Sequence, residues 1–296
     1  MPELPEVQTT VNSVARAIKE QVITAAWMDP RKPVNTGSNL AWTGIRSKIT
    51  GRKIKSVTRR AKFIVIHLDN GSSLCIHQKM TGHLLVGRWG HRKGIWTSRI
   101  AGPLAEDPMN RYIRLLFTFK NGKQLALSDA RRFARIILVR LNEKLSEIKE
   151  LARLGPEPLE LKLSEFEALL KARRGRIKPT LTDPTVIVGI GNIYADEILY
   201  RAGVYPFDLI PRLEKRQVQK MYRAMRSILA AAIRAGGSST DDYRTPDGNR
   251  GRYQNYHRAY QRTGQVCGIC HRAKIKRIVR NGRSSHFCPA HQVAHD

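Results

Sequence analysis

Apolar residues near the start of the chain recur with the period of an α-helix. Val7, Val11, Val14 and Ile18 follow one another at spacings of four, three and four, so their side chains share one face. The spacing predicts an amphipathic helix over residues 5–19. Residues 1–4 then lie at a helix N-terminus, where unpaired backbone N–H groups and the helix dipole favour anions.

The hydrophobic period changes to two between about residues 52 and 140. Apolar residues recur at every second position in two runs, which are Ile64, Ile66 and Leu68, and Ile113, Leu115, Phe117 and Phe119. This alternation predicts antiparallel strands that bury one face. Two Asn-Gly dipeptides each join apolar runs, which is the strongest short-range signal for a β-hairpin: Asn70-Gly71 and Asn121-Gly122.

Helical patterns return in the second half of the chain. They predict helices over residues 162–173, 192–202 and 213–235. The last is the strongest, because a stripe of apolar residues precedes a pair of glycines that can end a helix. The stripe consists of Val218, Met221, Met225, Ile228 and Ala232, and the glycines are Gly236 and Gly237.

Together these patterns predict a two-domain α+β protein. The N-terminal domain is an antiparallel β-sandwich led by a helix, and the C-terminal domain is helical and carries a small hairpin module. Gly, Pro and Arg are frequent in residues 88–111, which predicts a long loop within the first domain. The expected parts are residues 1–140 (sandwich), 141–160 (linker), 161–237 (helices), 238–262 (polar mobile loop) and 263–296 (small module).

The charge balance narrows the class of partner. The chain has 53 Lys and Arg against 24 Asp and Glu, a net charge of +29 that is spread along its whole length. Such a field attracts polyanions, and nucleic acid is the leading candidate. The alternatives are a solvated basic surface or an RNA-binding protein of the translation machinery.

Other features bear on the compartment. The sequence contains no apolar run of about 18 residues, so no membrane span is expected, and its start lacks the pattern of a signal peptide. Three of the four cysteines cluster near the C-terminus. This favours a metal site in a reducing cytoplasm over a disulfide framework. If the source is a bacterium, a nucleic-acid partner implies a location at the nucleoid.

The cysteine cluster has the spacing of a zinc site. It consists of Cys267-x2-Cys270, then seventeen residues, then Cys288-x2-His291. Two close pairs across a short hairpin suit one tetrahedral structural zinc ion per chain. A redox CxxC pair is the alternative reading. His291 has the spacing of a fourth ligand, with His286 and His295 as further candidates.

The second residue carries a possible nucleophile. Removal of Met1 would expose the secondary amine of Pro2, and an α-amino group is partly neutral at neutral pH. Attack of such an amine on a sugar carbon gives a cationic iminium, which is a strong electron sink. Glu3 could exchange protons with the sugar. By itself, a proline at position 2 is a weak signal.

Eight motifs, in family order and over nearly the whole chain, resemble those of the formamidopyrimidine-DNA glycosylase and endonuclease VIII family. The motifs are MPELPEV (1–7), RRAKF (59–63), MTG (80–82), DARRF (129–133), LGPEP (154–158), KPTL (178–181), GIGNIYADE (189–197) and, in the zinc-ribbon-like finger, NGRS (281–284). The motif GIGNIYADE is similar to the helix-two-turns-helix signature.

The resemblance implies a bifunctional base-excision-repair glycosylase and AP lyase acting on duplex DNA as a monomer. It assigns Pro2 as the Schiff-base nucleophile and Glu3 as the acid/base at the ribose. Lys62 would contact phosphate and assist β-elimination. Arg283 would grip phosphates around the flipped nucleotide and assist δ-elimination.

The resemblance also implies a set of DNA contacts. Met80, Arg131 and Phe133 would fill the space left by an extruded base. This is physically sensible, because flexible and flat side chains can wedge a base stack and an arginine can bond the widowed base. The glycine-rich turn before Asn192 would let a backbone approach a phosphate. The remaining members of the set are Glu6, Asn110 and Lys178.

Within the family, the branch that excises oxidised purines such as 8-oxoguanine and formamidopyrimidines fits best. The polar segment from Ser238 to Gln254 is similar to that branch's loop over the flipped purine, and such a loop suits closure over a substrate. An endonuclease VIII-like enzyme for oxidised pyrimidines is one alternative. A damaged-DNA-binding protein without catalysis is another.

Four features depart from the family pattern. His291 replaces the fourth cysteine of the finger, and Asn110 stands in the place of a phosphate-binding histidine. Residues 183–185 (DPT) replace a glutamine, and the loop at 88–111 is different. These departures affect DNA grip and substrate range, and they leave Pro2, Glu3 and Lys62 unchanged.

Overall fold

The computed structural model describes residues 1–37 and 40–294. The chain divides into two compact units, which are described separately. Unit 1 comprises Met1–Ala152 and Ala235–Arg252, and unit 2 comprises Arg153–Arg234 and Tyr253–Asp296. The segment expected as one loop over residues 238–262 is therefore divided, with its first part belonging to unit 1.

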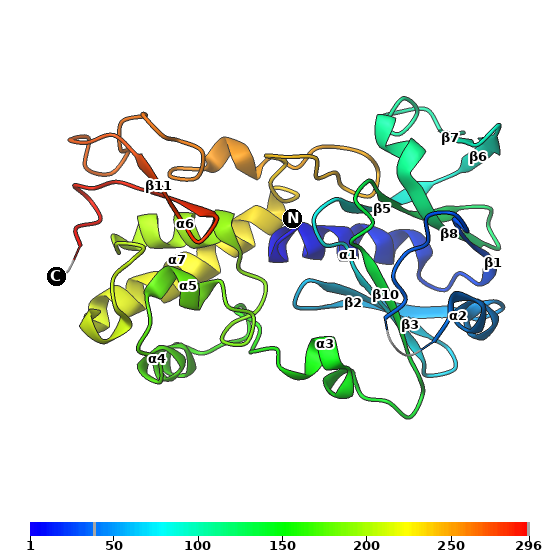
Figure 1. Ribbon diagram of the computed structural model, residues 1–296, viewed down its shortest axis with the longest axis horizontal. Coiled ribbons are helices and arrows are strands. Elements are labelled where there is room, and N and C mark those ends of the chain that lie inside the picture. Colours follow the sequence, from blue (N-terminus) through cyan, green and yellow to red (C-terminus); the bar gives the residue numbers. More distant parts are fainter. Residues whose placement is uncertain (38–39, 295–296) are drawn as a thin grey trace. The chain divides into compact units, whose positions relative to one another are not determined.

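Unit 1 is a β-sandwich with a leading helix (Figure 1). Among the described residues, one sheet has the strand order β1-β8-β9-β5 and the other the order β10-β4-β3-β2, and all pairs are antiparallel. The strands are β1 (Ile23–Met28), β2 (Ile54–Arg60), β3 (Phe63–Leu68), β4 (Ser73–His77), β5 (Gly82–Gly87), β8 (Ile113–Phe119), β9 (Gln124–Asp129) and β10 (Arg135–Val139).

The leading helix α1 (Leu4–Ile18) confirms the predicted helix within one residue at each end. All four residues of its apolar stripe are buried in the core shared with both sheets. The alternating residues of β3 and β8 face this same core, among them Ile64, Ile66, Leu115 and Phe117. Burial of this apolar surface is the main favourable contribution to the fold.

Both predicted hairpins are present. Gly71 joins β3 to β4 and has a φ of 80°, and Gly122 joins β8 to β9 and has a φ of 76°. Residues with a side chain adopt this left-handed region only at an energetic penalty, so glycine is well suited to these turns.

The segment 88–111 is more ordered than its composition predicted. It contains the hairpin of β6 (Trp89–Arg92) and β7 (Ile95–Ser98) and most of a 3₁₀ turn, Pro108–Tyr112. The prediction of a plain loop was wrong there, because the hairpin is largely exposed and lacks alternating apolar residues. Trp89 and Leu104 from this segment cover the outer face of the β1-β8-β9-β5 sheet.

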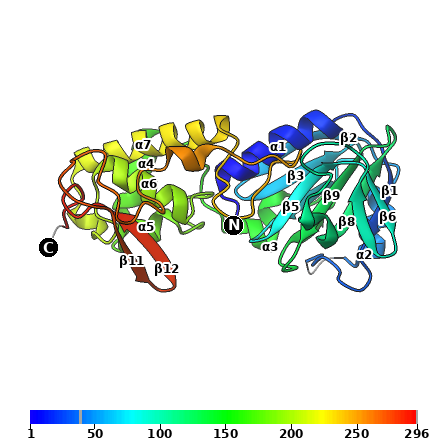
Figure 2. The ribbon, with the colours of Figure 1, turned by 90° about the horizontal axis from the view of Figure 1, so that it is seen from above.

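Unit 2 is helical and carries a small β-hairpin, drawn in red in Figure 2. Its predicted helices are confirmed as α4 (Leu163–Lys171), α6 (Asn192–Ala202) and α7 (Lys215–Arg234). The five apolar residues of the α7 stripe are all buried. The hairpin strands β11 (Lys276–Arg280) and β12 (Arg283–Phe287) pair in register, and β12 packs on α6.

Three short helices were not predicted. They are α2 (Trp42–Ile49), α3 (Lys149–Ala152) and α5 (Ile177–Leu181). Each is about two turns or less, which is too short for a hydrophobic period to stand out from its surroundings. Within the described residues, no helix combines the length and apolar character needed to cross a bilayer.

Candidate functional site

The N-terminus of α1 is organised around two glutamates. Glu3 is the N-cap residue, and its backbone N–H donates a hydrogen bond to Glu6 Oε2 at 2.9 Å. The Glu3 side chain is only 3% exposed. Pro2 is also buried, while Met1, which is bonded to its nitrogen, is 48% exposed. This reciprocal capping fixes the direction in which the first residues leave the helix.

Glu6 also holds a second segment of unit 1. Its Oε1 accepts a hydrogen bond from the Ser238 N–H at 2.7 Å, and its carbonyl oxygen accepts one from the Tyr243 hydroxyl at 3.1 Å. Burial, and then the nearby Glu6 carboxylate, raise the pKa of Tyr243, so its hydroxyl stays a donor. Glu6 is 2% exposed. The structure thus gives Glu6 internal partners, whereas the resemblance implied a DNA contact.

The segment 238–252 is tied to unit 1 at several points. Pro246 O accepts a hydrogen bond from the Val86 N–H of β5 at 2.7 Å, and Ser239 Oγ accepts one from the Gly251 N–H at 2.8 Å. Gly251 lies so close to Gly237 that a Cβ added at Gly251 would collide with the Gly237 carbonyl oxygen. The polar composition predicted a mobile loop, but these contacts hold its two ends together.

Lys62 lies in the β2–β3 turn, directly after Ala61, which has a φ of 53°. It is half-buried, and the positive charge of its ammonium group lowers the pKa of His77. Burial, then Lys79 and Lys62, lower the pKa of His77 to about 3, so its ring is neutral at physiological pH. Its Nδ1 accepts a hydrogen bond from the Lys79 N–H at 2.9 Å, which leaves Nε2 as the donor.

His77 is a candidate site residue that the sequence reasoning did not select. It lies at the end of β4, directly across from Phe63 of β3, and the two rings meet edge to face at 4.7 Å between their centroids. The pairing register, which joins it to the residue after Lys62, emerges only from the folded sheet. A residue whose pKa is strongly shifted by burial and by specific charged neighbours is a candidate for a functional site.

The three residues expected to fill a base-pair gap lie together on the surface. Met80 and Phe133 are 43% and 47% exposed, which is unusual for large apolar side chains. Arg131 lies between them. Its Nη1 is 3.7 Å from the Met80 sulfur, and its guanidinium carbon is 4.9 Å from the centre of the Phe133 ring. We call these three residues the wedge cluster.

The backbone turn that carries Arg131 and Phe133 is held by hydrogen bonds to a buried carboxylate. Asp129, 1% exposed, accepts hydrogen bonds from the backbone N–H groups of Arg131 and Ala134 and from the Thr81 hydroxyl. Buried, charge-assisted hydrogen bonds of this kind are stronger than neutral ones. Asp129 therefore fixes the turn that presents Arg131 and Phe133.

Asn110, which the resemblance places among the DNA contacts, lies inside unit 1. It is 4% exposed, its Nδ2 donates to Leu104 O at 2.8 Å, and its Oδ1 accepts from Trp89 Nε1 at 3.1 Å. Both ends of its amide are therefore engaged inside unit 1. Arg111, the next residue, is exposed and is better placed to meet an anion.

In unit 2, Lys178 is likewise engaged internally. Its ammonium contacts Asp196 Oδ1 at 2.6 Å, Ser284 O at 2.7 Å and Ser285 Oγ at 2.9 Å. The ion pair with Asp196 and the hydrogen bonds to Ser284 and Ser285 join α5 to α6 and to the hairpin strand β12. The phosphate contact that the resemblance implies for Lys178 stays a prediction.

Asn192 is the first residue of α6 and follows the N-cap residue Gly191. Its Nδ2 lies 3.4 Å from Ser284 Oγ, while its Oδ1 has no hydrogen-bond partner within the described part of the chain. Asn192 thus lies at the N-terminal end of α6, where the helix dipole favours an anion.

Arg283 begins β12, after a turn in which Asn281 and Gly282 have φ values of 49° and 71°. Two left-handed residues are characteristic of a tight hairpin turn with the right-handed twist of the strands. Arg283 is exposed, and its Nη1 is 3.4 Å from Thr182 Oγ1. It lines a cavity of about 530 Å³ with Arg176 and Arg280, so this surface is strongly cationic.

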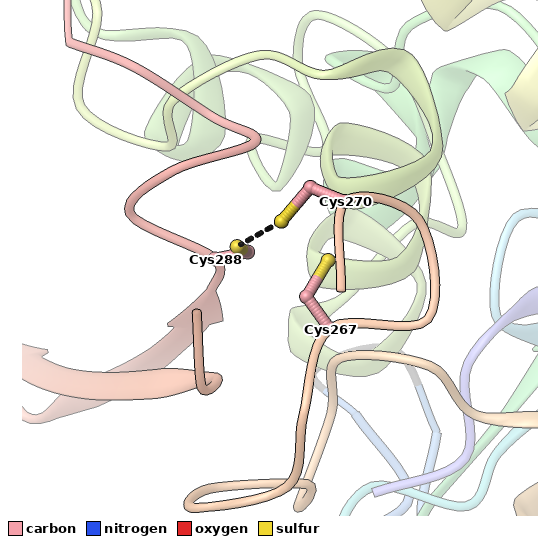
Figure 3. Close-up of side chains that lie close together, drawn as sticks. All are labelled: Cys267, Cys270 and Cys288. Carbon is pink, nitrogen blue, oxygen red and sulfur yellow. Dashed lines mark hydrogen bonds between the residues drawn. The ribbon is translucent and has the colours of Figure 1, made fainter. Parts of the chain in front are cut away.

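Three cysteines converge beside α6 (Figure 3). The sulfur atoms of Cys267, Cys270 and Cys288 all lie within 4.8 Å of one another. Burial alone would raise the pKa of Cys267. The N–H groups of Cys270 and Ile269 and other donors outweigh burial and lower this pKa to about 7. Clustered thiols with backbone N–H donors are a suitable ligand set for a metal ion.

The histidines proposed as a fourth ligand have other partners. His291 Nε2 is 2.8 Å from Tyr200 O, so Nδ1 is the ring nitrogen that a metal could use. His286 is buried, with its Nδ1 3.0 Å from Asp196 Oδ2. His295 lies outside the described residues. Neither His286 nor His291 belongs to the close sulfur group.

Known proteins resemble this chain over almost all of its length, and two family models match most of it. A family model described as the formamidopyrimidine-DNA glycosylase N-terminal domain matches residues 1–136, and one described as the formamidopyrimidine-DNA glycosylase H2TH domain matches residues 154–244. The formamidopyrimidine-DNA glycosylase of Solibacter usitatus is 39% identical, covering 98% of both chains. That of Desulforamulus reducens is 35% identical, covering 99% of this chain and 100% of the relative.

Solved structures agree with the sequence comparisons. The MutM (Fpg) protein of Thermus thermophilus has a TM-score of 0.81 and 33% identity, with 100% of both chains covered. The Lactococcus lactis Fpg (MutM), solved with DNA containing N7-benzyl-Fapy-dG, has a TM-score of 0.82 and 28% identity over 99% of this chain and 100% of that one.

The β-sandwich with its leading helix, the helical unit and the cysteine-bearing hairpin define the architecture of a DNA-repair glycosylase. The chain belongs to the formamidopyrimidine-DNA glycosylase family.

Proposed function

We propose that this protein is a bifunctional DNA glycosylase and AP lyase that removes oxidised purines, 8-oxoguanine and formamidopyrimidines among them, from duplex DNA. Pro2 is the nucleophile once Met1 has been removed. Its secondary amine attacks C1′ of the damaged nucleotide, the base leaves, and the resulting iminium supports β-elimination followed by δ-elimination.

The observation that carries this proposal is the arrangement at the start of α1. Met1 is half exposed and is bonded to the Pro2 nitrogen, so its removal opens that nitrogen on a side that solvent reaches. Glu3 is buried directly beside it and is fixed by the capping contact with Glu6. A buried carboxyl group next to an amine can move protons to and from the deoxyribose during ring opening.

Positive and polar side chains of each unit hold the DNA phosphates and assist the elimination steps. Lys62 holds a phosphate and assists β-elimination, and His77 supports it as a neutral N–H donor. Arg283 holds phosphates and assists δ-elimination, and Asn192 adds a contact at the α6 N-terminus. Each such contact of a cationic side chain replaces a condensed counterion on the DNA, which makes binding sensitive to salt.

The wedge cluster supports extrusion of the target base. Taking a nucleotide out of a duplex loses a few kcal/mol of stacking and pairing. Met80 and Phe133 are exposed and apolar, so they can enter the vacated stack, and Arg131 can bond the unpaired base opposite. None of the three needs to leave a buried position in order to do so.

We further propose that Cys267, Cys270, Cys288 and His291 hold one structural zinc ion, as the spacing and the convergence of sulfur atoms support. Zinc prefers a tetrahedral set of such ligands and stabilises small hairpin modules that have little core. The ion would keep the β11–β12 hairpin rigid and so orient Arg283.

The choice of oxidised purines rests on the segment 238–252. It is anchored to Glu6, the residue that also caps the helix start beside Pro2. A loop attached at that point is suited to cover a base near the amine. The Lactococcus lactis relative was solved with a formamidopyrimidine lesion, which supports the same substrate class.

The proposal is tested with duplexes carrying one 8-oxoguanine opposite cytosine, and with matched duplexes carrying thymine glycol or no lesion. Strand cleavage and borohydride-trapped complexes are measured. Faster cleavage at 8-oxoguanine, with trapping, is expected. Faster cleavage at thymine glycol would favour the endonuclease VIII-like alternative, and binding without cleavage or trapping would favour the non-catalytic one.

A further inference from the structure

A cavity in unit 1 has no part in the proposed reaction. It measures about 710 Å³ and lies where the end of β1, the β6–β7 hairpin and the start of β8 meet. This volume falls within the range of roughly 300–1,000 Å³ that is usual for pockets holding small ligands. We call it the aromatic cavity, after the rings of Trp27, His91, Trp96 and Tyr112 that line it.

Three of these rings, those of Trp27, His91 and Trp96, pack against one another. Trp27 and Trp96 meet edge to face with 5.0 Å between their centroids, and His91 is tilted against Trp96 at 4.5 Å. Trp27 and Trp96 also pack on the apolar cluster beneath the hairpin, which fixes their positions. Rings held in this way form a preorganised platform for another flat group.

The same cavity is strongly cationic. Four of its lining residues carry a positive charge: Arg31, Lys32, Arg111 and Arg114. Asp29 is the one acidic residue among the lining residues that the structure describes, and it is paired with the buried Arg114 at 2.9 Å. The guanidinium of Arg111 lies over the Tyr112 ring, 4.7 Å from its centroid. A ligand entering here therefore meets a net positive field.

These features select the chemical class of the ligand. The positive field disfavours cations, and the density of charged groups disfavours a purely apolar ligand. A flat ring linked to a phosphate satisfies both parts of the lining, because bases stack on aromatic side chains while arginine and lysine bind phosphate. The base must be unpaired, since the neighbouring pairs cover its faces within a duplex.

We propose that the aromatic cavity binds an unpaired nucleotide of a DNA strand, with the base against Trp96 and His91 and its phosphate on Arg31, Lys32 and Arg111. The site is separate from the wedge cluster and from Pro2, and none of the residues in those groups lines it. It gives the protein a contact with single-stranded or frayed DNA in addition to the duplex contacts proposed above.

The test measures fluorescence anisotropy of a labelled twelve-nucleotide oligothymidine binding to the full-length protein at low salt. A twelve-unit abasic oligomer with the same phosphates is the second probe. Two pairs of variants are compared. Trp96→Leu keeps apolar volume but removes the platform, whereas Ile95→Ala changes an exposed neighbour outside the lining. Arg111→Gln and Lys93→Gln each remove one exposed positive charge, and only Arg111 lines the cavity.

We expect Trp96→Leu and Arg111→Gln each to weaken oligothymidine binding by about tenfold, in line with the loss of one stacked base or one phosphate contact. Ile95→Ala and Lys93→Gln should change it by less than about twofold, and the abasic oligomer should bind about tenfold more weakly than oligothymidine. Thermal melting of each variant checks that it is folded.

Equal affinities for the two probes, or equal losses in the lining and control variants, would show a general electrostatic attraction and overturn the proposal. Excision of 8-oxoguanine from a duplex is measured in parallel. An unaltered protein that fails to excise but still binds oligothymidine through Trp96 would reject the proposed function alone, so the two claims fail independently.

Discussion

Glu6 and Ser238 are separated by 232 positions in the sequence, yet the Ser238 N–H donates a hydrogen bond to Glu6 Oε1 at 2.7 Å. The other carboxylate oxygen accepts the Glu3 N–H. One buried side chain thus couples the start of α1 to the loop expected to cover the substrate. In this arrangement, a change in the loop affects the residue beside the proposed nucleophile.

The first prediction concerns this coupling. Glu6→Gln replaces one acceptor oxygen with an amide NH₂, so one of the two backbone N–H groups loses its partner. The free energy of unfolding should fall by about 1–3 kcal/mol, which is the usual effect of one unsatisfied buried donor. Urea denaturation measures this change, and hydrogen exchange of the Ser238 or Glu3 amide should become faster.

Asn12→Ala is the matched control, because Asn12 lies on the exposed face of the same helix and its Oδ1 accepts only a surface hydrogen bond from Gln8. Its effect should stay within about 0.5 kcal/mol. If Glu6→Gln were as mild as Asn12→Ala and left both amides protected, Glu6 would not have the linking role described here.

The second prediction concerns the wedge cluster. Because Phe133 is 47% exposed, Phe133→Ala should leave the melting temperature nearly unchanged. Its excision of 8-oxoguanine from a duplex should fall by about tenfold or more, since the gap in the stack is no longer filled. On a single-stranded abasic substrate, which has no stack to wedge, cleavage should be nearly normal.

Leu141→Ala provides the comparison, since Leu141 is another exposed apolar residue of unit 1, at 67% exposure, and lies outside the wedge cluster. It should behave like the unaltered protein on both substrates. A Phe133→Ala variant that lost activity equally on duplex and single-stranded DNA would indicate a role other than base-stack insertion.

The third prediction separates a structural lysine from a phosphate-binding one. Lys178→Met leaves Asp196, which is fully buried, without its ammonium partner. Removing one member of a buried ion pair destabilises a protein by about 3–5 kcal/mol, so unit 2 should unfold at a markedly lower urea concentration. Lys171→Met, at an exposed position of α4, should have little effect.

DNA affinity distinguishes the two roles of Lys178 directly. Below its unfolding transition, the Lys178→Met variant should keep the salt dependence of DNA binding seen for the unaltered protein, because no phosphate contact is lost. If the variant were stable and its DNA binding depended less steeply on salt, Lys178 would make the direct phosphate contact that the family resemblance implies.

The fourth prediction concerns the metal. Purified protein should contain one equivalent of zinc, and Cys267→Ser, Cys270→Ser and Cys288→Ser should each lose it, since a tetrahedral site needs its thiolates. Cys75→Ser, within the buried strand β4, should retain it. Zinc retained in all three finger variants would place the metal elsewhere. Loss in His291→Ala but not in His286→Ala would identify the fourth ligand.

The larger features of the fold were predictable because they follow periodic patterns. The α1 and α7 stripes and the alternation in β3 and β8 each repeat often enough to determine an element and its buried face. The β6–β7 hairpin has no such pattern, because most of its side chains face solvent and its two strands form a separate two-stranded sheet.

The site was predictable by residue type but not by orientation. The sequence led us to expect that Met80, Arg131 and Phe133 act as a group, and they lie together on the surface. It did not show that Glu6 and Lys178 turn inward. A charged side chain is satisfied internally only when distant residues such as Ser238 and Ser284 come to it, and no local pattern records such a contact.

The central claim is that the amine of Pro2 attacks the sugar. The most direct measurement traps the protein with borohydride on a duplex containing 8-oxoguanine, digests the complex and locates the adduct by mass spectrometry. The account predicts an N-terminal peptide without Met1 that carries the sugar remnant on Pro2, and no adduct in a Pro2→Gly variant at comparable yield. An adduct on a lysine, or a retained Met1 in a protein that still cleaves the lesion, would contradict it.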